Sequence, residues 1–273
     1  MSTRRIILCA DDYGISPAVS AAIRDLIARG RVNAASVMVV SPSFNGAEAA
    51  ALREAAGATA AIGLHVTLTA PFTPLYRGYA PLRRGAFLPL AATLRRAHLR
   101  SLLPASLAAE IASQFVAFKS AFGRPPDFVD GHQHVHLFPQ IRDAVLRITK
   151  ESAPQAWVRQ CGRNAQKKRF GDLKALLLDR LSRRFRELAA EYGLRTNPAF
   201  AGTYAFRATA DYPRLFETFL NGLPDGGVIM CHPGKVDAEL KRLDPLTDLR
   251  EREYDFFSAV TFPRLLAEHG VAL

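Results

Sequence analysis

Short runs of hydrophobic residues alternate along the chain with longer segments in which apolar positions recur at helical spacing. The short runs predict strands at residues 6–10, 35–40, 61–68, 127–130, 156–160 and 227–231, and a weaker extended segment at 198–206. The longer segments predict helices at residues 17–29, 45–56, 105–122, 140–150, 171–192, 212–221 and 257–269. Ser16, Pro17 and Gly30 support the bounds of the first helix as N-cap, first helical residue and stop signal.

This alternation predicts an α/β fold with a parallel sheet of about seven strands, because parallel strands need crossover helices between them. A chain of 273 residues is long enough for the sheet to close into a TIM-like (β/α) barrel, and an open doubly wound sheet is the second option. Without an internal repeat or a low-complexity linker, residues 1–273 are expected to form a single domain. A stretch rich in proline and glycine at 70–89 interrupts the alternation, and we expect a substrate-facing insertion at about 70–104.

The composition is that of an ordinary globular enzyme, with 49% hydrophobic and 22% charged residues. No run approaches the roughly 20 apolar residues of a membrane-spanning helix. The apolar run near the N-terminus is too short for a secretion signal. The three cysteines are far apart and odd in number, which favours a reducing, cytoplasmic location over a disulfide framework.

The net charge of +11 would suit a nucleic acid, an anionic membrane surface or an acidic substrate. Much of the excess lies in an arginine-rich region at 160–195. Arginines and aromatic residues do not alternate there as they do in proteins that stack single-stranded bases. We therefore interpret the region as a solvated helix face and expect no nucleic-acid partner.

Ionisable side chains occur at the ends of four predicted strands, where the active sites of parallel α/β folds form. Asp11 and Asp12 end the first strand, His65 lies near the end of the third, His132 follows the fourth and His232 follows the last clear strand. Taken singly, the aspartates could begin a turn, His65 could be a core histidine and His232 a turn residue. Gathering all of them unpaired would cost stability, whereas a metal ion supplies the charge that carboxylates and imidazoles require.

The segment DGHQHVH at 130–136 places three histidines at alternate positions. An extended backbone would put all three on one face, but Gly131 and Pro139 indicate that the strand ends here. We therefore expect the three side chains to diverge, so that one binds the metal while the others orient ligands or substrate.

A site with one carboxylate and two imidazoles leaves coordination positions open for water and substrate. A metal held there lowers the pKa of bound water towards about 7, which predicts a hydrolase. A second carboxylate beside the ligands would serve as general base, and His232 could protonate the leaving group. The two imidazoles favour zinc, cobalt or nickel, while the carboxylate and open positions also allow magnesium or manganese.

Four motifs resemble those of the YdjC-like carbohydrate deacetylases, whose best-known type acts on chitooligosaccharides. They are ADDYG at 10–14, GLH at 63–65, DGHQHVHLFP at 130–139 and MCHPG at 230–234. The resemblance covers most of the chain. It implies a deformed (β/α) barrel that removes acetyl groups from N-acetylated sugars with one divalent metal ion, magnesium or zinc, and it suggests a homodimer.

The resemblance also implies a role for individual residues. It makes Asp12, His65 and His132 the metal ligands, Asp11 the catalytic base, and His232 the acid or oxyanion partner. The residues expected to contact these groups or the substrate are Asp130, His134, His136 and Arg159. Tyr13 stands where members often have phenylalanine, and Gly-His-Gln at 131–133 where they often have Ser-His-His, which leaves the ligands intact and the substrate open.

Two other functions stay open from the sequence. A barrel hydrolase of the amidohydrolase or phosphoesterase type usually carries its paired histidines on the first strand, where this chain has two aspartates. A non-catalytic carbohydrate- or nucleic-acid-binding protein would not need the complete ligand set. The sugar could be chitobiose, a glycolipid headgroup, or an antibiotic or cell-wall intermediate. Aromatic residues beside arginines in the 70–89 stretch could form a platform for its ring, namely Phe72, Tyr76, Tyr79 and Phe87.

Overall fold

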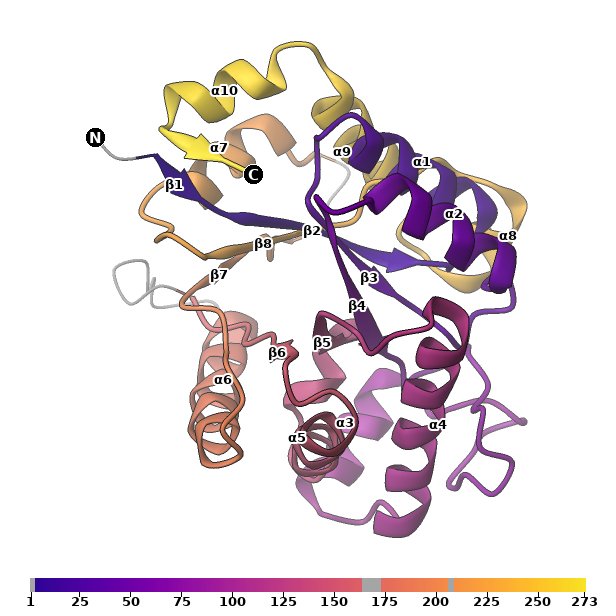
Figure 1. Ribbon diagram of the computed structural model, residues 1–273. Helices are drawn as coiled ribbons and strands as arrows, with labels where there is room; N and C mark the ends of the chain where they lie inside the picture. Colours follow the sequence, from indigo (N-terminus) through magenta and orange to yellow (C-terminus); the bar gives the residue numbers. More distant parts are fainter. Residues whose placement is uncertain (1–2, 164–172, 206–208) are drawn as a thin grey trace.

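A curled sheet of parallel strands lies at the centre of the protein, with helices packed around it (Figure 1). The computed structural model describes residues 3–163, 173–205 and 209–273. Within these ranges the sheet has seven strands in the order β6-β5-β4-β3-β2-β8-β7, and every neighbouring pair is parallel. The strands are β2 (Ile7–Tyr13), β3 (Ala34–Val37), β4 (Ala61–Val66), β5 (Phe128–Gly131), β6 (Trp157–Val158), β7 (Phe200–Ala201) and β8 (Val228–Cys231).

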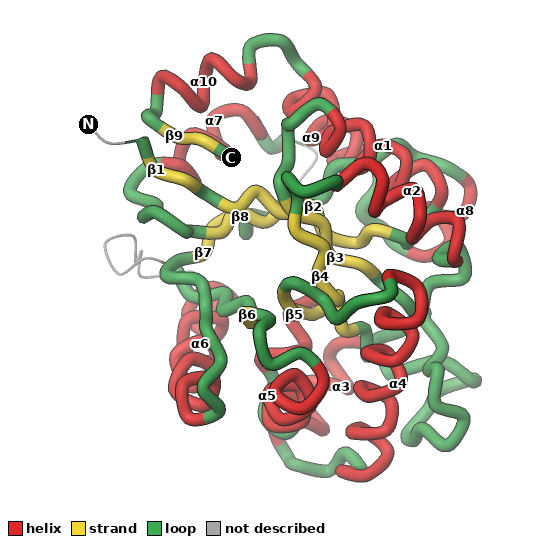
Figure 2. The backbone as a smooth tube through the Cα atoms, viewed as in Figure 1, coloured by secondary structure: helices red, strands yellow, loops and turns green. Residues whose placement is uncertain are grey.

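The two edge strands of this sheet approach each other through the residues just before β7. An isolated parallel bridge joins Val158 of β6 to Thr196. The side-chain amide of Asn197 accepts a hydrogen bond from the N–H of Gln160 at 2.9 Å and donates one to its carbonyl at 3.1 Å. These contacts draw β6 towards β7, and the curled sheet confirms the predicted fold class, a deformed TIM-like barrel (Figure 2).

Helices surround the sheet and follow the strands in the predicted alternation. They are α1 (Pro17–Ala28), α2 (Gly46–Ala56), α3 (Leu90–His98), α4 (Pro104–Phe122), α5 (Ile141–Ser152), α6 (Leu173–Glu191), α7 (Tyr212–Leu220), α8 (Ala238–Leu243), α9 (Asp248–Ser258) and α10 (Phe262–Glu268). A short parallel pair, β1 (Arg4–Arg5) with β9 (Val271–Ala272), brings the two ends of the chain together. In the described part of the chain, no helix combines the length and apolar character needed to cross a bilayer.

Local sequence signals and packing fix the elements that carry the site. Ser16 caps α1 as predicted, by accepting a hydrogen bond from the N–H of Val19 at 3.4 Å. Gly63 in β4 is required by packing, because a Cβ there would lie 2.3 Å from the ring of Phe128 in β5. The Phe128 ring stacks in turn on Trp157 of β6, with 4.7 Å between ring centroids. Strands β4, β5 and β6 are therefore held in a fixed relation beneath the residues that end them.

The structure corrects the prediction near the C-terminus. The sequence predicts one helix at 257–269, whereas α9 ends at Ser258 and α10 begins at Phe262. The chain leaves the helical region directly after α9 (φ −60°, ψ 144°), and a proline in the first turn of α10 starts a new helix. The hydrophobic pattern misses most of α9 because its buried face includes two charged residues, Arg250 and Glu253.

Other elements differ from the prediction in extent. The insertion at 70–104 contains the helix α3, which the pattern does not predict. The extended segment predicted at 198–206 reduces to β7, and residue 206 lies outside the described residues. Residues 171–172 of the predicted helix 171–192, and residues 164–172 of the arginine-rich region, also lie outside them.

Candidate active site

Three side chains that the sequence assigns to a metal ion meet at the carboxyl ends of the strands. Asp12 lies near the end of β2, His65 near the end of β4, and His132 opens the short 3-10 helix η1 (His132–Leu137) after β5. Oδ1 of Asp12 lies 3.3 Å from Nε2 of His65 and 2.9 Å from Nδ1 of His132. All three side chains are buried, and one ligand atom from each lies within 4.8 Å of the others. The residues present are therefore compatible with a divalent metal site.

The backbone at Asp12 explains how two consecutive aspartates both reach this end of the barrel. In a regular strand, neighbouring side chains point to opposite faces of the sheet. Asp12 has a left-handed backbone (φ 66°), and the pairing of β2 with β3 becomes irregular between Ala10 and Tyr13. This irregularity lets Asp12 face the two histidines while Asp11 joins a different set of partners.

His65 is oriented by a buried carboxylate behind it. Its Nδ1 lies 2.7 Å from Oδ1 of Asp130 and 2.9 Å from the hydroxyl of Ser36, which also donates to Asp130. Nε2 is thereby directed towards Asp12, in the carboxylate–imidazole arrangement that orients histidines in metal sites. Burial lowers the pKa of His65, but the carboxylates of Asp130 and Asp12 outweigh it and raise the pKa to about 10. The surroundings of His65 therefore favour a positive charge at this point.

Arg159, which follows β6, links the second aspartate to the same network. Its guanidinium donates two hydrogen bonds to Asp11, at 2.7 and 2.8 Å, and lies 2.6 Å from Oδ2 of Asp130. It also donates to the thiol of Cys9 at 2.8 Å. Burial lowers the pKa of Arg159, but the two carboxylates outweigh it and raise the pKa well above its ordinary value. The side chain is only 1% exposed, so Arg159 acts on these carboxylates rather than directly on a substrate.

Arg250 in α9 is a residue of the site that the sequence does not reveal. Its Nη2 lies 2.5 Å from Oδ2 of Asp12 and 2.7 Å from Oδ2 of Asp244, and the side chain is fully buried. Burial raises the pKa of Asp12, but His132 and Arg250 outweigh it and hold the pKa well below its ordinary value. No motif surrounds Arg250, and its helix was not predicted, so the sequence carries no signal for this contact.

The ionised side chains of this network have a net negative charge that a divalent cation would balance. Four carboxyl groups take part, those of Asp11, Asp12, Asp130 and Asp244. Two guanidinium groups oppose them, those of Arg159 and Arg250. With every carboxyl ionised and His65 neutral, as a metal ligand must be, the network lacks two positive charges, which is the charge that a divalent ion carries. Without a metal, the raised pKa of His65 allows a proton to supply part of that charge. Burying the excess negative charge without such a partner would be costly.

The three histidines of the DGHQHVH segment diverge, as the sequence predicts. Gln133 and His134 both have left-handed backbones (φ 53° and 61°), so the chain turns sharply between His132 and His136. His136 is buried, and its Nε2 donates to the carbonyl of Arg159 at 2.8 Å. Burial lowers the pKa of His136 to about 4, so it is neutral and fixes the backbone of Arg159. It cannot reach a substrate.

His134, by contrast, remains partly exposed. Its Nδ1 lies 3.5 Å from the thiol of Cys161, and its ring meets Phe200 edge-on at 5.9 Å. Burial, together with the nearby His136, lowers the pKa of His134 well below its ordinary value. This places a neutral imidazole at the edge of the site.

His232 follows β8, and its backbone is held by Glu253 of α9. Its N–H donates to Oε2 of Glu253 at 2.6 Å, and the hydroxyl of Tyr204 donates to Oε1 at 2.7 Å. Burial raises the pKa of Glu253 to about 7. Burial also lowers the pKa of His232, against the opposing charge of Asp12. Glu253 was not predicted, because a glutamate in a polar helix gives no indication of burial.

The aromatic residues of the 70–89 stretch do not form the sugar platform that the sequence suggests. Phe72, Tyr79 and Phe87 are buried, at 2%, 6% and 0% exposure, and Tyr76 alone of the four is exposed. The Phe72 ring meets His132 edge-on at 5.8 Å, while Tyr79 and Phe87 pack against each other at 5.1 Å. These rings hold the insertion together, so the expectation of a stacking surface is wrong for three of the four.

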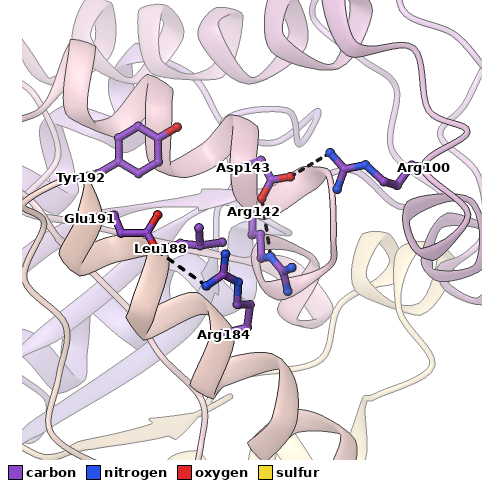
Figure 3. Close-up of a pocket in the computed structure, with 7 residues that line it drawn as sticks. All are labelled: Arg100, Arg142, Asp143, Arg184, Leu188, Glu191 and Tyr192. Carbon is purple, nitrogen blue, oxygen red and sulfur yellow. Dashed lines mark hydrogen bonds and ion pairs between the residues drawn. The ribbon is translucent and has the colours of Figure 1, made fainter.

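A cavity of about 530 Å³ lies away from this site, between α5 and α6 (Figure 3). It is lined by Arg100, Arg142, Asp143, Arg184, Leu188, Glu191 and Tyr192. Arg100 lies 3.3 Å from Asp143, and Arg184 lies 3.7 Å from Glu191, so acidic partners offset its arginines. None of the predicted catalytic or metal-binding residues lines this cavity.

Comparisons with known proteins support the fold and relate the chain to a family. The model of a family described as YdjC-like protein matches residues 5–268. A chitooligosaccharide deacetylase of Serratia marcescens is 31% identical over 229 residues, covering 78% of this chain and 88% of the relative. The crystal structure of a proposed cellobiose-phosphate cleavage protein of Enterococcus faecalis has a TM-score of 0.78 at 22% identity, covering 100% of this chain and 97% of that one. A lactam utilization protein of Thermus thermophilus has a TM-score of 0.52 at 15% identity, covering 100% of this chain and 99% of that one.

Proposed function

The chain belongs to the YdjC-like protein family, and on that premise we propose that it is a metal-dependent hydrolase that removes an acetyl group from an N-acetylated sugar. The observation that carries the proposal is the meeting of Asp12, His65 and His132 around one point, with the carboxylate of Asp11 in the same buried network. The chitooligosaccharide deacetylase among its relatives supports an acetylated sugar as substrate.

The donor set fits one divalent ion. One carboxylate oxygen and two imidazole nitrogens give three protein ligands and leave positions for water and substrate. Nitrogen donors favour zinc, and the carboxylate with open positions also suits magnesium. When bound, such an ion supplies Lewis acidity and lowers the pKa of water. On the protein side, Asp130 fixes the orientation of His65, and Arg250 holds the second oxygen of Asp12.

Asp11 is the proposed general base. Arg159 occupies one lone pair on each oxygen of Asp11, which fixes the carboxylate in one orientation. Each oxygen keeps a further lone pair that can take a proton from the water attacking the acetyl carbonyl carbon. His232 is the proposed general acid, donating a proton to the departing amine nitrogen. Burial lowers the pKa of His232, so the protonated form that can donate is lost at a lower pH than in an ordinary histidine. The role of His232 as general acid should therefore weaken as the pH rises.

A screen of N-acetylated sugars for released acetate, with and without a chelator, tests the proposal. Chitobiose is the first substrate to try, because of the relative named above. Asp12→Ala should lose both bound metal and turnover, whereas Asp11→Asn should keep the metal and lose turnover. His98→Ala changes an exposed histidine of α3 and is the matched control. Hydrolysis by Asp11→Asn at the parental rate would show that another group is the base.

The cysteines support a cytoplasmic location as part of the same proposal. Cys9, Cys161 and Cys231 are all buried free thiols. Free thiols are typical of a reducing compartment. A homodimer remains an expectation that sedimentation of the purified protein would test.

A further inference from the structure

The insertion at 70–104 carries an unbalanced positive charge. It contains six arginines, and no aspartate or glutamate occurs between Glu54 and Glu110. Arg100 pairs with Asp143 at 3.3 Å. Within the described ranges of the chain, no ion pair engages the other five, Arg77, Arg83, Arg84, Arg95 and Arg96. The segment therefore presents a positively charged surface.

The same segment exposes large apolar side chains between its arginines. Leu99 is 71% exposed and Leu103 is 54% exposed, while Leu75, Leu82 and Leu90 lie between 38% and 40%. Leu82 directly precedes the pair Arg83–Arg84, and Leu99 directly precedes Arg100. Single exposed leucines are common on protein surfaces, but several on one short segment indicate an interaction site.

These leucines are not needed for the packing of the insertion itself. Phe72, Tyr79 and Phe87 form its buried core, and the N–H of Phe87 donates to the carbonyl of Phe72 at 2.9 Å. The N–H of Ala80 donates to the hydroxyl of Ser106 in α4 at 2.9 Å. The exposed leucines and arginines therefore project from a fixed framework rather than from a loose loop.

The insertion lies at the end of the barrel that carries the candidate site. It begins after β4, which ends just beyond His65, and its Phe72 contacts His132. It ends at the start of α4, and Arg100 reaches Asp143 in the first turn of α5. The part before α3 projects from the body of the protein beside α4 (Figure 1). A surface that bound the insertion would therefore lie at this end of the barrel.

We propose that the insertion face, defined by Leu75, Leu82, Arg83, Arg84, Arg95 and Leu99, binds the surface of an anionic lipid bilayer. The guanidinium groups of the arginines pair with phosphate oxygens of the lipids, and the leucines enter the boundary between headgroups and acyl chains. Charge complementarity selects this occupant, because the three arginines of this face form no ion pair with any described residue and so attract an anionic layer. The inference does not depend on the proposed reaction, since binding is measured without turnover.

A nucleic acid is the principal competing polyanion, and the side chains disfavour it. Proteins that hold single strands stack bases on exposed aromatic rings. In the insertion, Phe72, Tyr79 and Phe87 are buried, and Tyr76 is the one aromatic ring that is exposed. The remaining exposed apolar groups are leucines, which offer no ring for stacking. A lipid surface uses both the arginines and the leucines.

Co-sedimentation with vesicles tests the inference. The full-length protein is mixed with vesicles of phosphatidylcholine alone or with added phosphatidylglycerol, at low and at physiological salt. The wild type should bind the anionic vesicles, less at higher salt, and should bind phosphatidylcholine weakly. Arg83→Ser with Arg84→Ser should weaken binding by roughly 25-fold, at about fivefold per arginine. Leu82→Ser with Leu99→Ser should weaken it several-fold at unchanged charge.

Matched controls come from α10 and the segment before it. Val260→Ser and Arg264→Ser change exposed residues outside the insertion and should bind vesicles as the wild type does. Circular dichroism and thermal unfolding establish that every variant is folded. Three results would each overturn the inference: no binding of the wild type to anionic vesicles, full binding by the arginine variant, or full binding by the leucine variant. If the leucine variant bound the vesicles as the wild type does and a single-stranded RNA displaced it from them, the face would be assigned to nucleic acid instead.

Discussion

Glu253 is the carboxyl group through which pH should act most directly on the stability of this fold. Burial raises its pKa from the ordinary value of 4.5 to about 7, against the hydrogen bonds from Tyr204 and from the backbone of His232. A raised pKa means that folding favours the protonated form. The stabilisation is therefore fully present below pH 4.5 and is lost as the pH rises through about 7.

The size of the effect follows from that difference. Each pKa unit corresponds to about 1.4 kcal/mol, so the rise from 4.5 to about 7 amounts to roughly 3 kcal/mol of unfolding free energy. Glu253→Gln removes the titration while keeping the shape. The amide oxygen can still accept from the N–H of His232, and the amide nitrogen can donate to the hydroxyl of Tyr204, which can also act as acceptor.

Urea unfolding at several pH values measures the effect. The chain has one tryptophan, Trp157, which stacks on Phe128 in the sheet, so its fluorescence reports on the core. In metal-free buffer, the unfolding free energy of the wild type minus that of Glu253→Gln should fall by roughly 3 kcal/mol between pH 4.5 and pH 8. Glu54→Gln, which removes an exposed glutamate of α2, is the matched control for loss of a carboxyl. A difference that stayed constant with pH, or grew, would refute the reasoning.

Three further outcomes follow from the same contacts. Metal-free protein titrated with zinc or magnesium should bind one ion per chain and gain about 2.7 kcal/mol of unfolding free energy at 100 times the dissociation constant. Calorimetry and thermal shift measure both, and Asp12→Ala should lose both. Arg159→Met should lower the unfolding free energy by about 3–5 kcal/mol, because it leaves buried carboxylates unpaired, whereas Arg264→Met should change it little. Gly202→Ala should reduce the melting temperature sharply, because its Cβ would lie 2.2 Å from the carbonyl oxygen of Met230 at a φ of 108°.

The parallel sheet and the candidate residues at its carboxyl end could be predicted because their signals are local. Buried parallel strands form short hydrophobic runs, and the polar residues at the end of each run lie at the rim of the barrel. Position therefore indicates a set of candidates, which are Asp11, Asp12, His65, Asp130, His132 and His232. The resemblance to the YdjC-like deacetylases is what selects Asp12, His65 and His132 among them as the proposed metal ligands. The divergence of the histidines was also predictable, since Gly131 and Pro139 mark the end of the strand.

Two of the supporting charged residues could not be predicted, because burial of a charged residue in a helix leaves no mark in the sequence. Arg250 and Glu253 sit on the inner face of α9, where the pattern requires apolar residues. In the sequence, this segment has the composition of a solvent-exposed segment, so the pattern predicts no helix over most of α9. The role predicted for the aromatic residues of the insertion is wrong for a different reason. Rings that anchor their own loop have the same composition as rings that receive a ligand.

Two acidic clusters lie next to each other at the end of the barrel, and the choice of cation in each explains why one metal ion is expected rather than two. Cys9, Asp11 and Asp130 are close enough to ligate a metal, but the guanidinium of Arg159 contacts all three. A permanent cation already fills that cluster. In the other cluster, Arg250 contacts only the far oxygen of Asp12, and the near oxygen faces two imidazoles. Imidazoles bind a metal in the neutral form and supply donor atoms without charge, so this second cluster is the one proposed to hold a divalent ion.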